Sequence, residues 1–186
     1  MNAISYRMEG SMSAENDDHT HPDHFPPHGR LAAVDYGTVR MGIAICDPDR
    51  RLVTPVEVYQ VRSPKKDSDY FNQLARDERL TGYVVGLPIH CDGAESQKSL
   101  ECRQFGKWLH EQTGLPVRLF DERFSTASAK DRLRSMALSP AKVKKRLDAV
   151  AALILLESFI ESCRYHDSIM GQSIDRPPEG DDSIGD

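Results

Sequence analysis

The sequence predicts a mixed α/β domain in which helices flank one five-stranded sheet, with the element order βββ-αβ-αβ-α. Three apolar runs follow one another closely, at 31–35, 41–46 and 53–61, and such short links favour an antiparallel meander. After residue 69, helical patterns alternate with apolar runs, which is typical of parallel strands joined by helical crossovers. A chain of 186 residues is long enough for one compact domain with flexible ends.

Local signals bound the individual elements. The segment Asp47-Pro48-Asp49 predicts the turn after the second strand, and Pro55 predicts that the third strand lies at an edge of the sheet. Gly114 suits the C-cap of an amphipathic helix. The remaining predicted elements are strands at 83–87 and 117–120 and helices at 69–80, 95–113, about 126–136 and 140–162.

The two chain ends differ from the middle in composition. Residues 1–29 are polar and rich in His and Pro, and residues 164–186 finish in acids, so both are predicted to be disordered acidic tails around a domain at 30–163. Five acids and one base give the first tail a charge of −4, and six acids and two bases give the second tail −4. Of the total charge of −5 the middle therefore carries +3, which is compatible with a nucleic-acid partner.

Composition also argues against several classes of protein. No apolar run approaches the roughly 20 residues that a membrane-spanning helix needs. The N-terminus lacks the basic stretch followed by an apolar stretch that marks a secretory signal. The four cysteines form no C-x-x-C pair. We therefore expect a soluble, cytoplasmic protein with reduced thiols and no membrane partner.

Acidic residues stand where two strands end and where the last helix packs. Asp35 ends the first strand, and Asp121 and Glu122 end the fifth. Asp148 lies at the border of the inward face that helical spacing predicts for Val143, Leu147, Val150 and Ile154. The carboxyl ends of neighbouring parallel strands form the usual site edge of such a sheet, and carboxylates gathered there repel one another unless a cation compensates them.

The chemistry of these donors points to a metal-dependent nuclease. Oxygen ligands suit Mg²⁺ or Mn²⁺ rather than zinc, and such ions can activate water and stabilise the leaving oxygen in phosphodiester cleavage. We therefore predict that Asp35, Glu122 and Asp148 bind the metal and catalyse the reaction, with Asp121 as a further catalytic candidate.

Each acid also has a structural alternative. Asp35 could accept hydrogen bonds from the amides of the turn that follows it. Either Asp121 or Glu122 could pair with Arg123 or cap the next helix, and Asp148 could pair with Lys144 one helical turn earlier. These alternatives treat each acid separately, whereas a metal site accounts for all of them at one edge of the sheet.

Basic residues near the acids are candidates for nucleic-acid binding through phosphate contacts. Arg40 could contact phosphate or brace the first hairpin. The basic residues of the last helix could contact phosphate or form a solvated face. The full set of candidates is Arg40, Arg123, Lys142, Lys144, Lys145 and Arg146.

Four sequence blocks, in order, resemble one known family. Residues 34–44, VDYGTVRMGIA, are similar to the opening D-x-G-x-x-R-x-G-x-A of the YqgF family. The later blocks are VVGLP at 84–88 with Asp-Gly at 92–93, LPVRLFDERFST at 115–126, and DAVAA at 148–152 with Ile-Leu at 154–155. The blocks cover about residues 30–162, so the match is specific. His90 and Cys91 depart from the residue types expected in the second block.

The resemblance implies a fold, an activity and partners. YqgF proteins are pre-16S rRNA nucleases that are also described as Holliday-junction-resolvase-like. The resemblance therefore implies an RNase H-like fold, a hydrolase that matures the 5′ end of 16S rRNA in ribosome biogenesis, and acidic residues that bind a divalent metal. It implies pre-rRNA or branched DNA as partner, in association with ribosome precursors, and it leaves both a monomer and a homodimer open.

Three rival functions fit parts of the sequence. A Holliday junction resolvase is the alternative within nucleases. Residues 35–38, DYGT, also resemble the phosphate loop of actin-like ATPases, but those enzymes need two such domains and this chain is too short for both. A non-catalytic ribosome-assembly factor with the same fold is the third rival, and the retention of every candidate acid argues against it.

Overall fold

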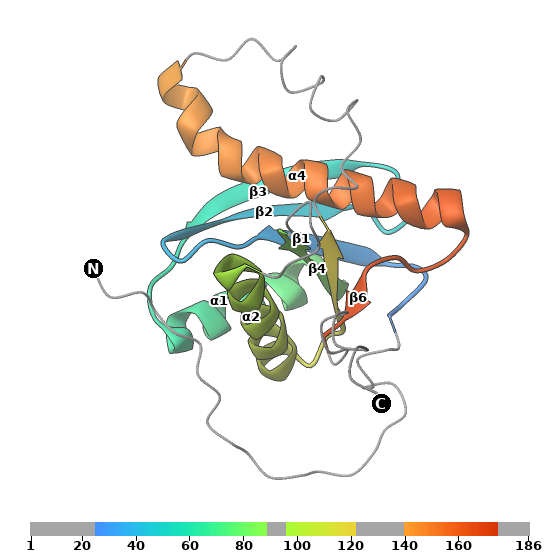
Figure 1. Ribbon diagram of the computed structural model, residues 1–186, viewed down its shortest axis with the longest axis horizontal. Coiled ribbons are helices and arrows are strands. Elements are labelled where there is room, and N and C mark those ends of the chain that lie inside the picture. Colours follow the sequence, from blue (N-terminus) through green and yellow to red (C-terminus); the bar gives the residue numbers. More distant parts are fainter. Residues whose placement is uncertain (1–24, 89–95, 122–139, 175–186) are drawn as a thin grey trace, which may run out of the picture.

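A six-stranded sheet forms the centre of the computed structural model, with α1 and α2 on one face and α4 on the other (Figure 1). The structure describes residues 25–88, 96–121 and 140–174, and the side chains of all of these except 140–148. No helix in this part of the chain is long and apolar enough to cross a membrane. The elements are β1 (Arg30–Asp35), β2 (Arg40–Cys46), β3 (Val53–Gln60), α1 (Pro64–Glu78), β4 (Leu80–Leu87), α2 (Gln97–Thr113), β5 (Val117–Asp121), α4 (Pro140–His166) and β6 (Gln172–Ser173).

The strand order is β3-β2-β1-β4-β5-β6, and the pairing follows the lengths of the links. The short links join antiparallel pairs, β1 with β2 and β2 with β3. The helical crossovers join parallel pairs, β1 with β4 and β4 with β5. These pairings confirm the predicted mixed sheet, and β3, which contains Pro55, lies at its edge as expected. The prediction of five strands omitted β6, which pairs antiparallel with β5.

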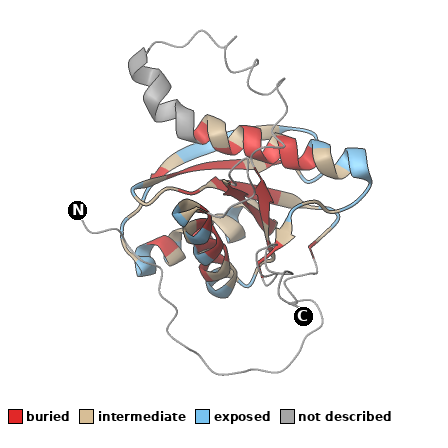
Figure 2. Ribbon diagram, viewed as in Figure 1, coloured by how far each residue is buried: buried red, intermediate tan, exposed pale blue. Residues whose placement is uncertain are grey.

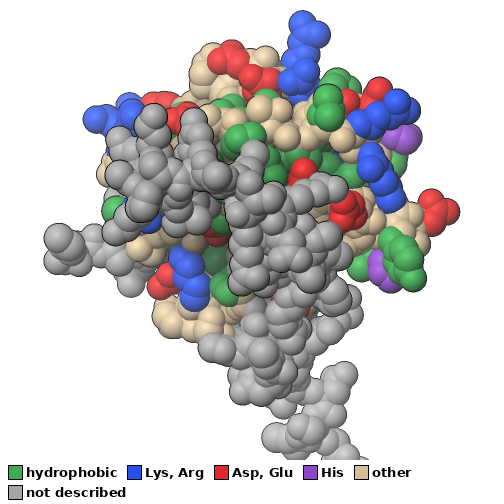
Figure 3. Space-filling model, turned by 90° about the horizontal axis from the view of Figure 1, so that it is seen from above, with side chains coloured by type: hydrophobic (Ala, Val, Ile, Leu, Met, Phe, Trp, Pro, Cys, Tyr) green, Lys and Arg blue, Asp and Glu red, His purple; other side chains and the backbone are tan. Residues whose placement is uncertain are grey.

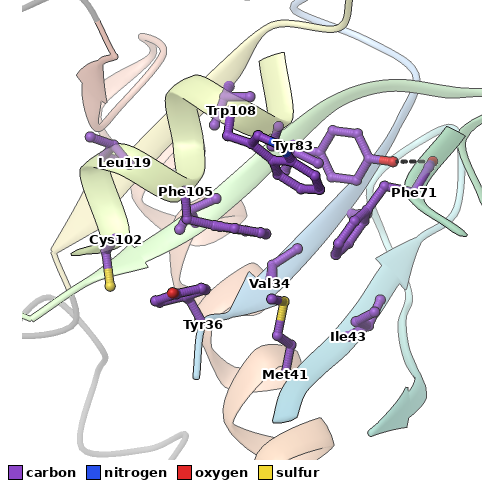
Figure 4. Close-up of a cluster of buried hydrophobic side chains, with 14 of the residues drawn as sticks. Val34, Tyr36, Met41, Ile43, Phe71, Tyr83, Cys102, Phe105, Trp108 and Leu119 are labelled. Atoms are coloured by element: carbon purple, nitrogen blue, oxygen red, sulfur yellow. Dashed lines mark hydrogen bonds between the residues drawn. The ribbon is translucent and has the colours of Figure 1, made fainter. Parts of the chain in front are cut away.

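Alternation along the strands divides the core into two layers. Val34 of β1 packs with Phe71 of α1 and Phe105 of α2 in the cluster shown in Figure 4. Its neighbour Ala33 belongs to a second cluster, which contains Phe159 of α4. Because successive side chains of a strand point to opposite faces, the even-numbered positions of β1 face α1 and α2 and the odd-numbered positions face α4. Figure 2 shows the buried residues of the helices on the sides that face the sheet.

Capping residues fix where α1 and α2 begin and end. The helix α1 begins at Pro64, earlier than the predicted start at 69, because Ser63 caps it and accepts a hydrogen bond from the amide of Lys66. Proline is well tolerated at the first helical position. The helix α2 lies within the predicted range, with Ser96 in a capping box and Gly114 as a left-handed C-cap with φ 67°.

The packed part of the chain extends past both expected limits of the domain at 30–163. Phe25 is 5% exposed and contacts the ring of Phe159. At the other end, α4 continues to His166 and is followed by β6 and by Ile174, which is 4% exposed. The predicted tails at 1–29 and 164–186 therefore include residues that belong to the core. The helix predicted at about 126–136 lies outside the described residues.

Candidate active site

The carboxyl ends of β1, β4 and β5 lie together at one end of the sheet, because these three strands are parallel. We call this end of the sheet the site edge. Asp35 closes β1, Leu87 closes β4 and Asp121 closes β5. In Figure 1 the turn from β1 into β2 and the passage from β3 to α1 lie on the left. The structure thus confirms that the predicted strands end together, and it also determines which face of the sheet each residue occupies.

Asp35 occupies the face of the sheet that α4 covers, as an odd-numbered position of β1. Its carboxylate-bearing side chain is half-buried. Its partner on β2 is Gly42, and the parallel register, in which Val34 pairs with Val85, places Gly86 of β4 next to it on the other side. Neither glycine has a side chain, so the two positions that flank Asp35 in the sheet contribute no side chain to this face.

Arg40 belongs to the same face and the same edge. Met41 and Ile43 of β2 lie in the cluster beneath α1 and α2, so the alternate positions 40 and 42 face α4. Arg40 is two residues from Gly42, the pairing partner of Asp35, and its side chain is half-buried. The structure therefore brings these two candidates, Asp35 and Arg40, to one place.

Asp121 faces the opposite side of the sheet. It pairs with Leu87, whose side chain belongs to the cluster beneath α1 and α2. Its neighbour Phe120 points to the α4 side, where its ring lies 5.5 Å from the ring of Phe159. Asp121 is 8% exposed. The candidates Glu122 and Arg123 lie outside the described residues.

The face of α4 that packs on the sheet agrees only in part with the predicted one, because Ile154 is buried and Val150 is not. The buried stripe runs through Ala152, Leu156 and Phe159, which are all fully buried, whereas Val150 is only half-buried. With about 3.6 residues per turn, position 148 lies one turn before Ala152 and about 40° to one side of it, at the border of that stripe. Asp148 and the candidates Lys142, Lys144, Lys145 and Arg146 lie within α4, in the segment whose side chains are outside the description.

Lys98 is a basic residue near the site that the sequence analysis missed. Its ammonium nitrogen lies 4.5 Å from the ring centroid of Tyr36, the residue after Asp35. The same ring stacks on that of Phe105, with centroids 4.7 Å apart (Figure 4). The signal that could have identified it was topological, since Lys98 lies in the first turn of α2, the helix that follows the carboxyl end of β4.

The Tyr36 hydroxyl adds no negative charge to this site. Burial, followed by the nearby Glu101 and Cys102, raises the pKa of Tyr36 to about 12. The phenol is therefore protonated at physiological pH. Its ring holds Lys98 beside the end of β1 through a cation–π contact, an interaction worth about 0.5–1 kcal/mol at an exposed site.

Asp35 is the predicted metal ligand whose side chain the structure describes. Within the described residues, no three His, Cys, Asp or Glu side chains come together as a metal-binding group. Of the other two predicted ligands, Glu122 lies outside the described residues, and Asp148 lies in α4 in the segment whose side chains are not described. An all-carboxylate donor set remains chemically suited to a hard cation such as Mg²⁺.

Comparison with known proteins identifies close relatives over most of the chain. The profile of the family described as RuvX, Holliday junction resolvase, matches residues 29–162. A protein of Rhodopirellula baltica that carries the provisional name pre-16S rRNA nuclease is 54% identical over 167 residues, which cover 90% of this chain and 96% of the relative. A protein of Bradyrhizobium diazoefficiens with the same provisional name is 38% identical over 138 residues, covering 74% of this chain and 86% of that protein.

The fold has a counterpart among solved structures. The T. thermophilus RuvC structure in complex with Holliday junction substrate superposes with a TM-score of 0.53 at 13% sequence identity, covering 76% of this chain and 99% of that one. This likeness shows the RNase H-like fold. The family profile and the two relatives show that the chain belongs to the RuvX family, the one that the four sequence blocks resemble under the name YqgF.

Proposed function

We propose that this protein is a divalent-metal-dependent endonuclease that cleaves pre-16S rRNA in the maturation of its 5′ end. The observation that supports the proposal most directly is the position of Asp35. This carboxylate ends a buried strand on the face that α4 covers, next to Gly42 and on the same face as Arg40. The provisional names of the relatives supply the RNA substrate.

We infer that Asp35, Glu122 and Asp148 hold Mg²⁺ or Mn²⁺. Position 148 precedes the fully buried Ala152 by one helical turn, so we expect Asp148 at the border of the face of α4 that packs on the sheet. Glu122 follows Asp121, and an extended chain alternates faces, so we expect Glu122 rather than Asp121 on the face of Asp35. A bound ion of this kind activates water and stabilises the leaving oxygen of a phosphodiester.

The basic residues of the edge would bind and orient the RNA backbone. Arg40 offers a planar guanidinium that can donate two hydrogen bonds to one phosphate, on the face that carries Asp35. Lys98 offers a point charge held over the Tyr36 ring. We propose that Lys142, Lys144, Lys145 and Arg146, which precede Asp148 in α4, contact neighbouring phosphates, and that Arg123 does so beside Glu122.

The test is the substitution Asp35→Asn, which keeps the size of the side chain and removes its charge. Single-turnover cleavage of a 16S precursor transcript, with Mg²⁺ or Mn²⁺, should fall at least about a hundredfold, the loss typical of one electrostatic catalytic group. Chelator should abolish cleavage by the unaltered protein. Asp49→Asn is the matched control, because Asp49 is exposed in the turn at the other end of the sheet. Near-normal cleavage by Asp35→Asn would contradict the site.

Branched DNA is the second candidate substrate, because the matching family profile is described as a Holliday junction resolvase. A four-way DNA junction belongs in the same assay, beside the RNA transcript. Cleavage of the junction in preference to the transcript would replace the RNA assignment and keep the site. If the protein cleaves neither substrate with either metal, the non-catalytic assembly factor becomes the better account.

A further inference from the structure

A group of basic side chains lies where β3 passes into α1. It consists of Arg62, Lys65 and Lys66, all exposed, and we call it the α1 corner. The amide of Val61 donates a hydrogen bond of 3.0 Å to the carbonyl oxygen of Val39, next to Arg40. The α1 corner is therefore tied to the same edge of the sheet as Asp35, at the left of Figure 1.

Buried hydrogen bonds hold the backbone of the α1 corner in place. The carboxylate of Asp67, which is fully buried, accepts hydrogen bonds from the Tyr59 hydroxyl at 2.7 Å and from the Arg62 amide at 3.0 Å. The Arg62 guanidinium lies 5.5 Å from the centroid of the Tyr59 ring. The acid in the first turn of α1 is thus bound internally, while the cations of the α1 corner face solvent.

The position of the lysines is unfavourable for the helix itself. The first turn of a helix stabilises negative charge and disfavours positive charge, and Lys65 and Lys66 lie in that turn. Among the described residues, no carboxylate lies within ion-pair distance of either ammonium group; the described ion pair joins Arg30 and Glu78, at 2.9 Å. A charge arrangement that opposes local stability and has no internal partner in the described part of the chain indicates an external anion.

We propose that the α1 corner binds phosphates of the substrate RNA strand at a distance from the bond that is cleaved, a proposal that rests on the proposed function. Arg40 lies on the α4 side of the sheet, and the α1 corner lies past the end of β3, towards the α1 side. A strand held at Asp35 and Arg40 reaches the α1 corner by passing round the end of β3. The α1 corner offers cations, and the Tyr59 ring beside Arg62 is buried, so the contact is to the backbone and independent of base sequence.

The test uses the full chain with Lys65→Ala and Lys66→Ala together. Affinity is measured against salt concentration in chelator, for single-stranded RNAs of arbitrary sequence from about 4 to about 16 nucleotides, the span of known single-strand site sizes. Each lost phosphate contact lowers the slope of log affinity against log salt by about 0.7 for single strands. The double variant should therefore lose about 1.4 of slope on the longest RNA and none on the shortest.

The control variant is Arg51→Ala with Arg76→Ala, which removes the same charge from exposed positions away from the site edge. A slope that is unchanged by Lys65→Ala with Lys66→Ala on the longest RNA, or flattened equally by both double variants, would overturn the proposal. A loss of about 1.8, from about 0.9 per duplex contact, on a four-way DNA junction but not on RNA would overturn the RNA assignment.

Cleavage measured separately keeps this proposal distinct from the proposed function. Suppose that the lysine substitutions flatten the slope of log affinity for RNA against log salt while the protein cleaves no transcript with Mg²⁺ or Mn²⁺. The proposed function is then wrong, and the proposal for the α1 corner is retained. If it cleaves the transcript while the lysine substitutions leave the slope unchanged, the α1 corner fails and the proposed function stands.

Discussion

At the scale of single residues, the face of the sheet decides which acid can act with Asp35. The motif around residues 121–123 offers two adjacent acids, and composition cannot choose between them. The structure places Asp121 opposite Leu87, on the side of α1 and α2, whereas Asp35 is on the side of α4. Since successive residues of an extended chain alternate, we expect the residue after Asp121 to be the better partner for Asp35.

We therefore expect Glu122→Gln to impair cleavage more than Asp121→Asn. Glu122→Gln should lower the single-turnover rate on a 16S precursor transcript at least about a hundredfold, as expected for the loss of one electrostatic catalytic group. Asp121→Asn should cost distinctly less, because its side chain belongs to the other layer of the core. Both substitutions preserve shape, and melting temperatures serve as the control for folding. The reverse order of rates would mean that Asp121 is the acid that acts with Asp35.

At the scale of elements, a buried carboxylate fixes the passage from β3 to α1. Asp67 is fully buried and bonds the Tyr59 hydroxyl and the Arg62 amide through the same oxygen, Oδ1. Burial and this hydrogen bond raise the pKa of Tyr59 well above its usual value, with burial the larger cause. The Tyr59 hydroxyl is therefore protonated at physiological pH and donates its hydrogen bond to Asp67.

We expect Asp67→Ala to lower the free energy of unfolding by about 1–3 kcal/mol, the cost of leaving buried donors without an acceptor. Asp67→Asn should cost less, because its amide oxygen can still accept one or both hydrogen bonds. Asp69→Ala, at an exposed position two residues later, should stay within about 0.5 kcal/mol of the unaltered protein. Urea unfolding measures all three variants. Equal stability of Asp67→Ala and Asp69→Ala would show that the buried bonds contribute nothing.

The elements also show what the sequence could and could not predict. The first five strands were predictable because each contains a short apolar run between turn residues, and the position of Asp35 at the carboxyl end of β1 was predictable with them. The start of α1 was missed because hydrophobic spacing begins only near Tyr70, whereas the capping pair Ser63-Pro64 marks the true start. In α4, Ile154 and Ser158 are buried as well as Ala152, so a hydrophobic period alone could not identify the face that packs on the sheet.

At the scale of the whole molecule, the limits of the folded unit depend on single buried side chains beyond the apolar runs. Phe25 packs edge-on against Phe159 with ring centroids 5.8 Å apart. Gly82 makes room for it, because a Cβ there would lie 3.0 Å from the Phe25 ring. Ile174 is 4% exposed and follows β6. A single buried residue hardly changes the average composition of a polar segment. Domain limits taken from composition, at 30 and 163, therefore leave out Phe25 and Ile174.

Charge also differs between the folded part of the chain and the segments on either side of it. Figure 3 shows Lys and Arg side chains at several places around the rim of the described surface on the α4 side. The residues on either side of the packed region are acidic in sequence. Five acids and one base give residues 1–24 a charge of −4, and the same numbers give residues 175–186 a charge of −4. A long-range field of this sign opposes the approach of RNA, and salt screens it over a Debye length of about 10 Å at 0.1 M.

The limits of the packed region and the charge outside it predict the stability and the RNA affinity of shortened chains. A chain of 25–174 keeps Phe25 and Ile174, so its free energy of unfolding in urea should match that of the full chain. A chain of 30–163 loses both side chains and should be at least about 3 kcal/mol less stable, since removing one buried Phe side chain alone costs about 3–5 kcal/mol. In filter binding at low salt, 25–174 should bind RNA more tightly than the full chain, because a charge of −8 is gone, and the two affinities should converge as salt rises.

Equal stability of the two shortened chains would show that Phe25 and Ile174 do not anchor the core. An affinity gain that persists at high salt would show that the removed segments act by contact rather than by charge.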